Sequence, residues 1–155
     1  MKWNFSKIVI GLVALILIVY LMFKLFYSTK LTITVPKNYQ GQVTLILSNV
    51  PKDILTVDEN GIGYITKQTF EIAHSEPIVL EEDGADVSDQ SVGFNPSTFW
   101  AVGKSSYATE ENSSGKELEI QFLSFELVPK DKKGEKQYYS PDLMELLDKT
   151  KLYRK

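Results

Sequence analysis

The stretch ELEIQFLSFELV, residues 117–128, decides the fold of this chain because it is its strongest strand pattern. Apolar side chains alternate along it, but the parity changes halfway, from Leu118, Ile120 and Phe122 to Leu123, Phe125 and Leu127. A strand with one buried face cannot bury both sets unless an extra residue shifts the phase. The pattern therefore predicts a β-bulge near Phe122–Leu123. A central strand buried on both faces is the alternative, and the glutamates of this stretch argue against it.

Shorter segments with strand character precede this stretch and set the fold class. They cover residues 31–35, 43–47, 54–58, 62–66, 69–73, 77–81 and 98–102, and several alternate β-branched or apolar residues with polar ones. Asn60-Gly61 predicts a tight turn between two of them. Short strands separated by turn signals predict a mainly β fold, an antiparallel β-sandwich of transthyretin- or immunoglobulin-like architecture.

A short C-terminal α-helix is predicted over residues 141–150. Ser140 is suited to cap it and Pro141 to begin it, and an apolar stripe of leucines and a methionine follows. Two polar stretches, 82–97 and 103–117, are long enough to be functional or mobile loops.

The N-terminal part of the chain differs sharply from the rest. After a short flank at 1–7, residues 8–23 are uncharged and apolar, and apart from Lys24 the apolar run continues to residue 27. A helix of about twenty such residues matches the hydrocarbon core of a bilayer, which predicts a transmembrane signal-anchor at 8–27. A cleaved signal peptide is the alternative, but no Ala-x-Ala site follows. The domain at 31–155 is then expected outside the cytoplasm, periplasmic or at the cell surface, on a single-pass membrane protein.

Charge and cysteine content exclude several functions. The whole chain has a net charge of −3, and residues 1–30 hold four lysines and no acidic residue, so residues 31–155 carry 13 basic and 20 acidic residues, a net of −7. Such a domain repels phosphodiester backbones, and nucleic acid is not an expected partner. The absence of cysteine excludes disulfides, thiolate chemistry and cysteine-ligated zinc.

Gly103-Lys104-Ser105 matches the end of a nucleotide-binding P-loop. That motif requires another glycine five residues earlier, where this chain has Thr98, and a helix immediately afterwards. Neither condition is met, so the tripeptide is interpreted as a strand-to-loop turn.

The acidic residues of the 82–97 loop are candidate metal ligands. Asp83, Asp86 and Asp89 could supply oxygen ligands to calcium, but the order of an EF-hand loop is absent and solvated acidic loops are far more common. No cofactor is predicted.

Aromatic residues near the loops are candidates for binding a partner. Phe99 and Trp100 are adjacent in a predicted strand, so one is expected in the core and the other at the surface. Trp100 and Tyr107 are the predicted partner-binding residues. His74, the single histidine, is interpreted as a structural or surface residue, because no nucleophile motif accompanies it.

Two motifs resemble an uncharacterised family of small bacterial envelope proteins. They are VPKNYQGQVTL at 35–45, with its P-x-N-x-x-G-x-V pattern, and DENGIGYI at 58–65. The resemblance covers about residues 33–130 and implies a membrane anchor or lipoprotein signal followed by one β-sandwich, a domain of unknown function. This chain departs from it by lacking a lipid-bearing cysteine, and the resemblance implies no catalytic residue.

These observations favour a non-enzymatic, membrane-anchored module of the bacterial cell envelope. Its expected partners are membrane lipid, through residues 8–27, and a protein that the domain binds or organises. The alternative is a ligand- or calcium-binding module that uses the acidic loop 82–97.

Overall fold

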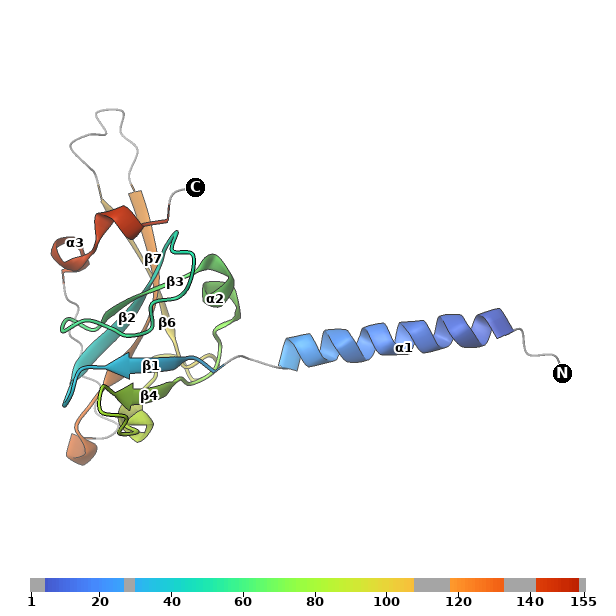
Figure 1. Cartoon of the computed structure of the whole chain (residues 1–155), viewed down its shortest axis with the longest axis horizontal. Helices are drawn as coiled ribbons and strands as arrows, with labels where there is room; N and C mark the ends of the chain where they lie inside the picture. The colour runs from blue at the N-terminus through green and yellow to red at the C-terminus, as the bar shows by residue number, and fades with distance from the viewer. Residues whose placement is uncertain (1–4, 27–29, 108–117, 133–141, 154–155) are drawn as a thin grey trace.

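The computed structural model of the chain describes residues 5–26, 30–107, 118–132 and 142–153. Seven strands and three short 3₁₀ turns form a β-rich domain from Leu31 onward, and an N-terminal helix stands apart from it (Figure 1). The strands form one sheet of five strands and one of two.

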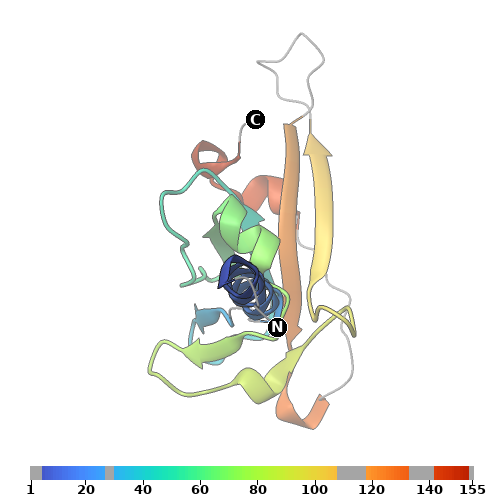
Figure 2. The same cartoon turned by 90° about the vertical axis from the view of Figure 1, so that its right-hand side faces the viewer.

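The larger sheet is built around β7 (Leu118–Leu127). One edge of β7 pairs antiparallel with β2 (Gly41–Leu47). Its other edge pairs with β6 (Ala101–Tyr107) and, near its end, with the two-residue β5 (Ser91–Val92), both antiparallel. Figure 2 shows β6 and β7 side by side. On the far side of β2, β3 (Ile62–Ile65) adds a parallel strand.

The β-bulge predicted near Phe122–Leu123 is wrong, because β7 pairs without a skipped residue on both edges. The two parities of apolar residues are instead buried on opposite faces. Leu123, Phe125 and Leu127 belong to one apolar cluster, and Ile120 belongs to a second cluster against which Phe122 packs. β7 is therefore a central strand buried on both faces.

The smaller sheet pairs β1 (Thr32–Val35) with β4 (Ile78–Glu81) in parallel. Residues 54–57 connect the two sheets. Thr34 exchanges backbone hydrogen bonds with Leu55 and Val57, both 2.9 Å, and Ile54 exchanges them with Tyr64 at 2.7 and 3.0 Å. One segment thus borders β1 in the smaller sheet and β3 in the larger.

The predicted antiparallel β-sandwich is therefore corrected to a pair of linked sheets with mixed strand directions. Two strand pairs are parallel, β1–β4 and β2–β3, and the sheets share residues 54–57 rather than facing each other as separate layers. The mainly β character stands. Periodicity fixes which residues lie on a strand, but it does not fix the direction in which strands pair.

The segment 69–73, predicted as a strand, lies mostly in helix α2 (Lys67–Ile72). Thr66 caps the helix by accepting a hydrogen bond from the Thr69 amide at 3.3 Å. The Asp53 carboxylate accepts from the Thr66 amide at 2.7 Å and from the Thr69 hydroxyl at 2.6 Å. A capped N-terminus with a carboxylate beside it overrides the strand propensity of the segment.

The C-terminal helix is shorter than the predicted range 141–150. In the described residues it is α3 (Leu143–Leu146), capped by Asp142, followed by the 3₁₀ turn η3 (Lys149–Lys151). Residues 140 and 141 lie outside the described part of the chain. The remaining 3₁₀ turns are η1 (Ser88–Gln90) and η2 (Lys130–Lys132). Residues 142–153 cover the second face of the larger sheet. Their leucines Leu143, Leu147 and Leu152 are all buried.

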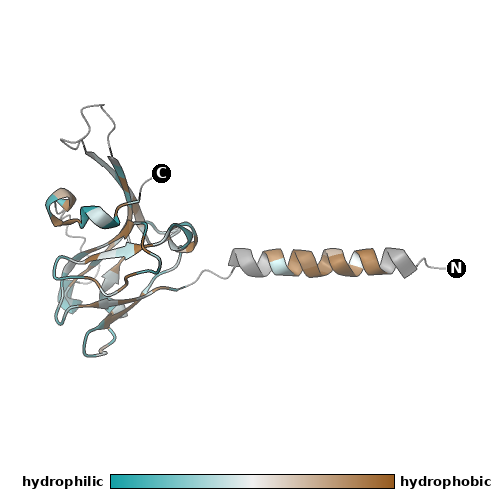
Figure 3. Cartoon of the chain, turned by 45° about the horizontal axis from the view of Figure 1, so that its top comes forward, coloured by the Kyte–Doolittle hydropathy of each residue, from teal (hydrophilic) through white to brown (hydrophobic). Residues whose placement is uncertain are grey.

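Helix α1 (Phe5–Phe26) occupies the predicted signal-anchor region, and Figure 3 shows how apolar its described residues are. Within the described part of the chain, no helix is both long enough and apolar enough to cross a membrane. The prediction of a transmembrane helix is therefore corrected to an apolar helix whose described side chains, residues 9–21, are exposed.

The two motifs at 35–45 and 58–65 contact each other in the structure. Gly61 has φ of +74°, and a methyl group added to it would collide with the Tyr39 side chain. The Tyr39 hydroxyl donates to the Gln42 carbonyl at 2.8 Å, which holds the ring over this glycine. Asn38 also has a positive φ, of 58°, which asparagine tolerates better than most residues. These motif residues are therefore explained by turn geometry.

We expect Gly61→Ala to destabilise the domain more than Gly84→Ala does. Both glycines have positive φ, so each substitution adds strain of about 1–2 kcal/mol. An added methyl group at Gly84 meets nothing within 4 Å, whereas at Gly61 it meets the Tyr39 ring, which costs roughly 1–3 kcal/mol more. Urea unfolding of the full chain in an uncharged detergent, followed by tryptophan fluorescence, measures both. Equal losses would contradict the Tyr39 contact.

Stability should fall at alkaline pH through Tyr39. Burial, reinforced by the nearby Asp58 carboxylate, raises the pKa of Tyr39 to about 12, above about 10 for an unfolded tyrosine. The unfolded chain therefore loses this proton first, so the free energy of unfolding decreases as pH rises from 10 to 12. Tyr39→Phe should have a smaller decrease in this range than the wild type. Identical pH profiles of unfolding for the two proteins would contradict this assignment.

Candidate functional site

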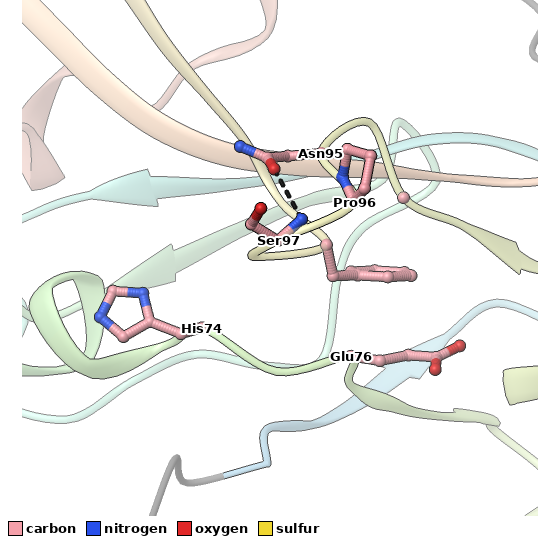
Figure 4. A pocket seen from close by; sticks show the side chains of 7 residues that line it. His74, Glu76, Asn95, Pro96 and Ser97 are labelled. Carbon is pink, nitrogen blue, oxygen red and sulfur yellow. Dashed lines mark hydrogen bonds between the residues drawn. The ribbon is translucent and has the colours of Figure 1, made fainter. Parts of the chain in front are cut away.

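A pocket of about 410 Å³ lies between residues 74–76 and the loop 93–99 (Figure 4). Its lining combines polar side chains, an aromatic ring and backbone, from His74, Glu76, Gly93, Asn95, Pro96, Ser97 and Phe99. A second pocket, of about 460 Å³ between residues 49–54 and 150–151, is more apolar. The first pocket is the stronger candidate because polar side chains from two segments line it.

The wall that carries His74 and Glu76 is held in place at both ends. Before it, α2 ends at the buried Ala73. In the middle, the Ser75 carbonyl accepts a hydrogen bond from the Trp100 indole at 3.0 Å. After it, the Ile78 amide donates to the Leu31 carbonyl at 2.8 Å, where β4 begins to pair with β1. The short exposed segment is therefore positioned by buried neighbours.

The opposite wall is a loop closed by its own hydrogen bonds. The Asn95 side-chain oxygen accepts from the Ser97 amide at 2.8 Å, as drawn in Figure 4. The Phe99 amide donates to the Asn95 carbonyl at 2.7 Å, and the Phe94 amide donates to the Phe99 carbonyl at 2.8 Å. These bonds fix the loop as a compact turn that presents Asn95, Pro96 and Ser97 to the pocket.

Phe99 adopts an unusual backbone conformation within this loop. Its φ is +63°, a region that bulky residues rarely occupy. The ring packs edge-on against Trp100 with centroids 5.8 Å apart, and against Phe125 at 5.7 Å. Gly93 has to be glycine here, because an added methyl group would lie 2.5 Å from the Phe99 carbonyl oxygen and 2.6 Å from its ring. The surroundings hold Phe99 in a strained position, as is typical of functional sites.

The polar groups of the pocket suit binding. Glu76 is exposed, and its carboxylate accepts a hydrogen bond from the Ser91 hydroxyl at 3.0 Å. Within the described residues, no hydrogen bond orients the His74 imidazole. The hydrogen-bonded nucleophile and base that a hydrolase uses are therefore not assembled around His74 in this part of the chain.

Of the two predicted partner-binding residues, the structure describes the side chain of Trp100. Trp100 is 1% exposed and its indole donates a hydrogen bond to the Ser75 carbonyl, so its side chain is not available at the surface. The side chain of Tyr107 lies outside the described residues. Phe99 is the member of the aromatic pair that lines the pocket. The sequence signal for Phe99 was its position next to Trp100 in a predicted strand. Periodicity alone did not show which of these two residues is buried.

The three aspartates predicted as weak metal candidates each have a local role. Asp83 forms an ion pair with Lys37 at 3.1 Å, and this contact lowers the pKa of Asp83. Asp86 accepts hydrogen bonds from the amide and hydroxyl of Ser88, which lower its pKa. Asp89 lies 4.0 Å from the Lys130 amine. Over the described ranges, no group of three or more acidic, histidine or cysteine side chains is placed to hold a metal ion.

Gly103-Lys104-Ser105 lies within β6 and not in a phosphate-binding turn. The stretch 103–117, predicted as a loop, therefore begins as a strand. Gly103 faces the Phe122 ring across the strand pair so closely that a methyl group could not fit. Lys104 forms an ion pair with Glu119 at 3.4 Å. The tripeptide serves packing and charge pairing.

No protein family model and no curated protein matches the chain. Among solved structures, the chain is similar to a crystal structure of a "Putative Lipoprotein from Bacillus anthracis", with a TM-score of 0.34 and 9% identity over 74% of this chain and 87% of that chain. A similarity this low assigns no family and no function.

Because Phe99 has a strained backbone, its glycine and alanine variants should differ in stability in the opposite sense to the usual one. Phe99→Ala removes the ring and keeps the positive φ, whereas Phe99→Gly removes the ring and relieves the strain. We expect Phe99→Gly to be the more stable variant by about 1 kcal/mol, the reverse of the usual preference for alanine. Urea unfolding of both full-length variants measures the difference. An alanine variant as stable as the glycine variant would show that Phe99 is unstrained.

Proposed function

We propose that this protein is a non-enzymatic binding module held at a lipid surface by α1, with its β-rich domain outside the cytoplasm. In this proposal α1 contacts lipid, and the domain recognises its partner through the pocket between residues 74–76 and 93–99.

Exposed apolar side chains on α1 carry the proposal. From Val9 to Leu21 the large apolar residues of the helix are between 45% and 68% exposed. Figure 3 shows that most of the described residues of the helix are hydrophobic. Water contact with so much contiguous apolar surface is unfavourable, and such surfaces in proteins mark contacts with membranes or partners.

The short connection between α1 and the domain supports a membrane-proximal location of the pocket. Residues 27–30 separate the end of α1 from Leu31, which is 7% exposed and belongs to the core. A connection of this length spans at most roughly 18 Å. Whatever covers α1 therefore lies close to the first residues of β1 and to β4, which pairs with it.

The proposal is tested by flotation of the full-length chain with liposomes. The double variant Leu15→Asp, Val19→Asp places two charges on one face of α1, and a charged side chain is strongly disfavoured in contact with lipid hydrocarbon. We expect wild type to float and the aspartate variant to bind lipid at least tenfold less.

Leu15→Ala with Val19→Ala is the matched control, because it shortens the same side chains without adding charge. It should still float. Flotation of the aspartate variant at the wild-type level, or recovery of wild type in the lipid-free fraction, would contradict the proposal. Tryptophan fluorescence of each variant confirms that the domain itself stays folded.

A further inference from the structure

We infer that the pocket between residues 74–76 and 93–99 binds an organic ammonium group, with the Glu76 carboxylate and the Phe99 ring as its two recognition elements. The inference rests on the proposed binding function and names the chemical class of the ligand. Three observations lead to it: the charge of the lining, the exposed surface of Phe99, and the unused bonding capacity of Glu76.

The charge of the pocket selects cations. Of the described residues that line it, Glu76 alone carries a formal charge with His74 neutral, and no lysine or arginine is among them. The net charge of −7 on residues 31–155 adds a field of the same sign. A phosphate or carboxylate ligand would meet no positive side chain in this lining.

The Phe99 ring supplies the second element. Part of its surface packs against Trp100 and Phe125, and another part lines the pocket. Cations are attracted to the face of an aromatic ring, and quaternary ammonium groups are recognised in this way. Because the loop hydrogen bonds hold Phe99 at its positive φ, the ring is in place before a ligand arrives.

The Glu76 carboxylate keeps capacity for a ligand. Its described partner is the Ser91 hydroxyl, which also lies 2.6 Å from the Ser88 carbonyl oxygen. A hydroxyl has one hydrogen, so Ser91 cannot donate to both oxygens at once. The ion pairs among the described residues do not include Glu76. A cation could therefore pair with this carboxylate without displacing a lysine or arginine.

Two sources could supply the same ammonium chemistry. One is a soluble amine, and the other is the headgroup of a lipid. Glu76 lies two residues before Ile78, which pairs with Thr32 at the start of β1, close to the attachment of α1. This position brings the pocket near any lipid that α1 contacts.

The test uses choline and its uncharged analogue 3,3-dimethylbutan-1-ol, which has nearly the same shape. The full chain is held in maltoside detergent and carries Trp3→Phe, so that Trp100, beneath the pocket, is the remaining tryptophan. We expect choline to change Trp100 fluorescence saturably and the neutral analogue to bind at least tenfold more weakly. Calorimetric titration measures the same affinities without relying on Trp100.

Glu76→Gln should weaken choline binding at least tenfold, because it removes the charge and keeps the shape. Glu82→Gln is the matched control, since it removes one exposed carboxylate of the same domain from outside the pocket lining. It should bind choline as the wild type does. Equal affinity for choline and the neutral analogue, no binding of choline, or an unchanged affinity in Glu76→Gln would overturn the inference.

Nanodiscs distinguish a soluble amine from a lipid headgroup as the ligand, and flotation distinguishes the ammonium inference from the proposed lipid contact. If phosphatidylethanolamine added to phosphatidylglycerol nanodiscs lowers the apparent affinity for choline, the ligand is a lipid headgroup; an unchanged affinity assigns a soluble amine. Glu76→Gln should still float with liposomes. Flotation without choline binding would overturn the ammonium inference and leave the lipid contact by α1 standing. Choline binding without flotation would overturn the lipid contact and leave the ammonium inference standing.

Discussion

The rest of the structure depends on the burial of β7 on both of its faces. On one face its side chains belong to the apolar cluster that includes Ile33, Val35 and Trp100, and on the other they belong to the cluster that includes the leucines of the C-terminal segment. A strand buried in this way requires partners on both edges and cover on both sides, because unpaired backbone groups and bare apolar side chains are each unfavourable. β2, β5 and β6 meet the first requirement. The need for cover on both sides explains why residues 142–153 return to the sheet. There the Asp148 amide donates a hydrogen bond to the Tyr64 hydroxyl at 2.8 Å.

Local sequence signals predicted the elements better than their arrangement. Strands near 31–35, 43–47, 62–66 and 77–81 are present, and the turn at Asn60-Gly61 has the positive φ that its glycine implies. The double parity of 117–128 was visible, but its cause lay in residues 143–152, which cover the second face from a distance in sequence. Helix α2 likewise depends on Asp53, thirteen residues before Thr66. Contacts between residues that are far apart in sequence outweigh local propensity, and the hydrophobic periodicity of the sequence does not reveal them.

The candidate site was predicted less well for the same reason. Its two walls lie about twenty residues apart in sequence and meet because the indole of Trp100 reaches the Ser75 carbonyl. Trp100 was predicted as a partner-binding residue, but it is 1% exposed and its indole is hydrogen-bonded to the Ser75 carbonyl. A positive φ at a phenylalanine cannot be anticipated from its residue type, which disfavours that conformation. The aspartates of the 82–97 loop looked like ligands because pattern reasoning does not show that Lys37 and Ser88 already engage two of them.

The pocket and the apolar helix are connected through one structural element, the parallel pair β1–β4. β1 begins where α1 is attached, and β4 begins two residues after Glu76, with Thr32 opposite Ile78 in the register. The hydrogen bond from the Ile78 amide to the Leu31 carbonyl ties these two starting points together at 2.8 Å. Because Ile33 and Val35 of β1 and Val79 of β4 are buried in the core, the distance between the helix attachment and the pocket wall is fixed by packing. Residues 27–30 span at most roughly 18 Å between Phe26 and Leu31, so the proposed lipid contact of α1 would place the pocket near the lipid surface. A ligand for this pocket is therefore best sought among molecules at or in that surface.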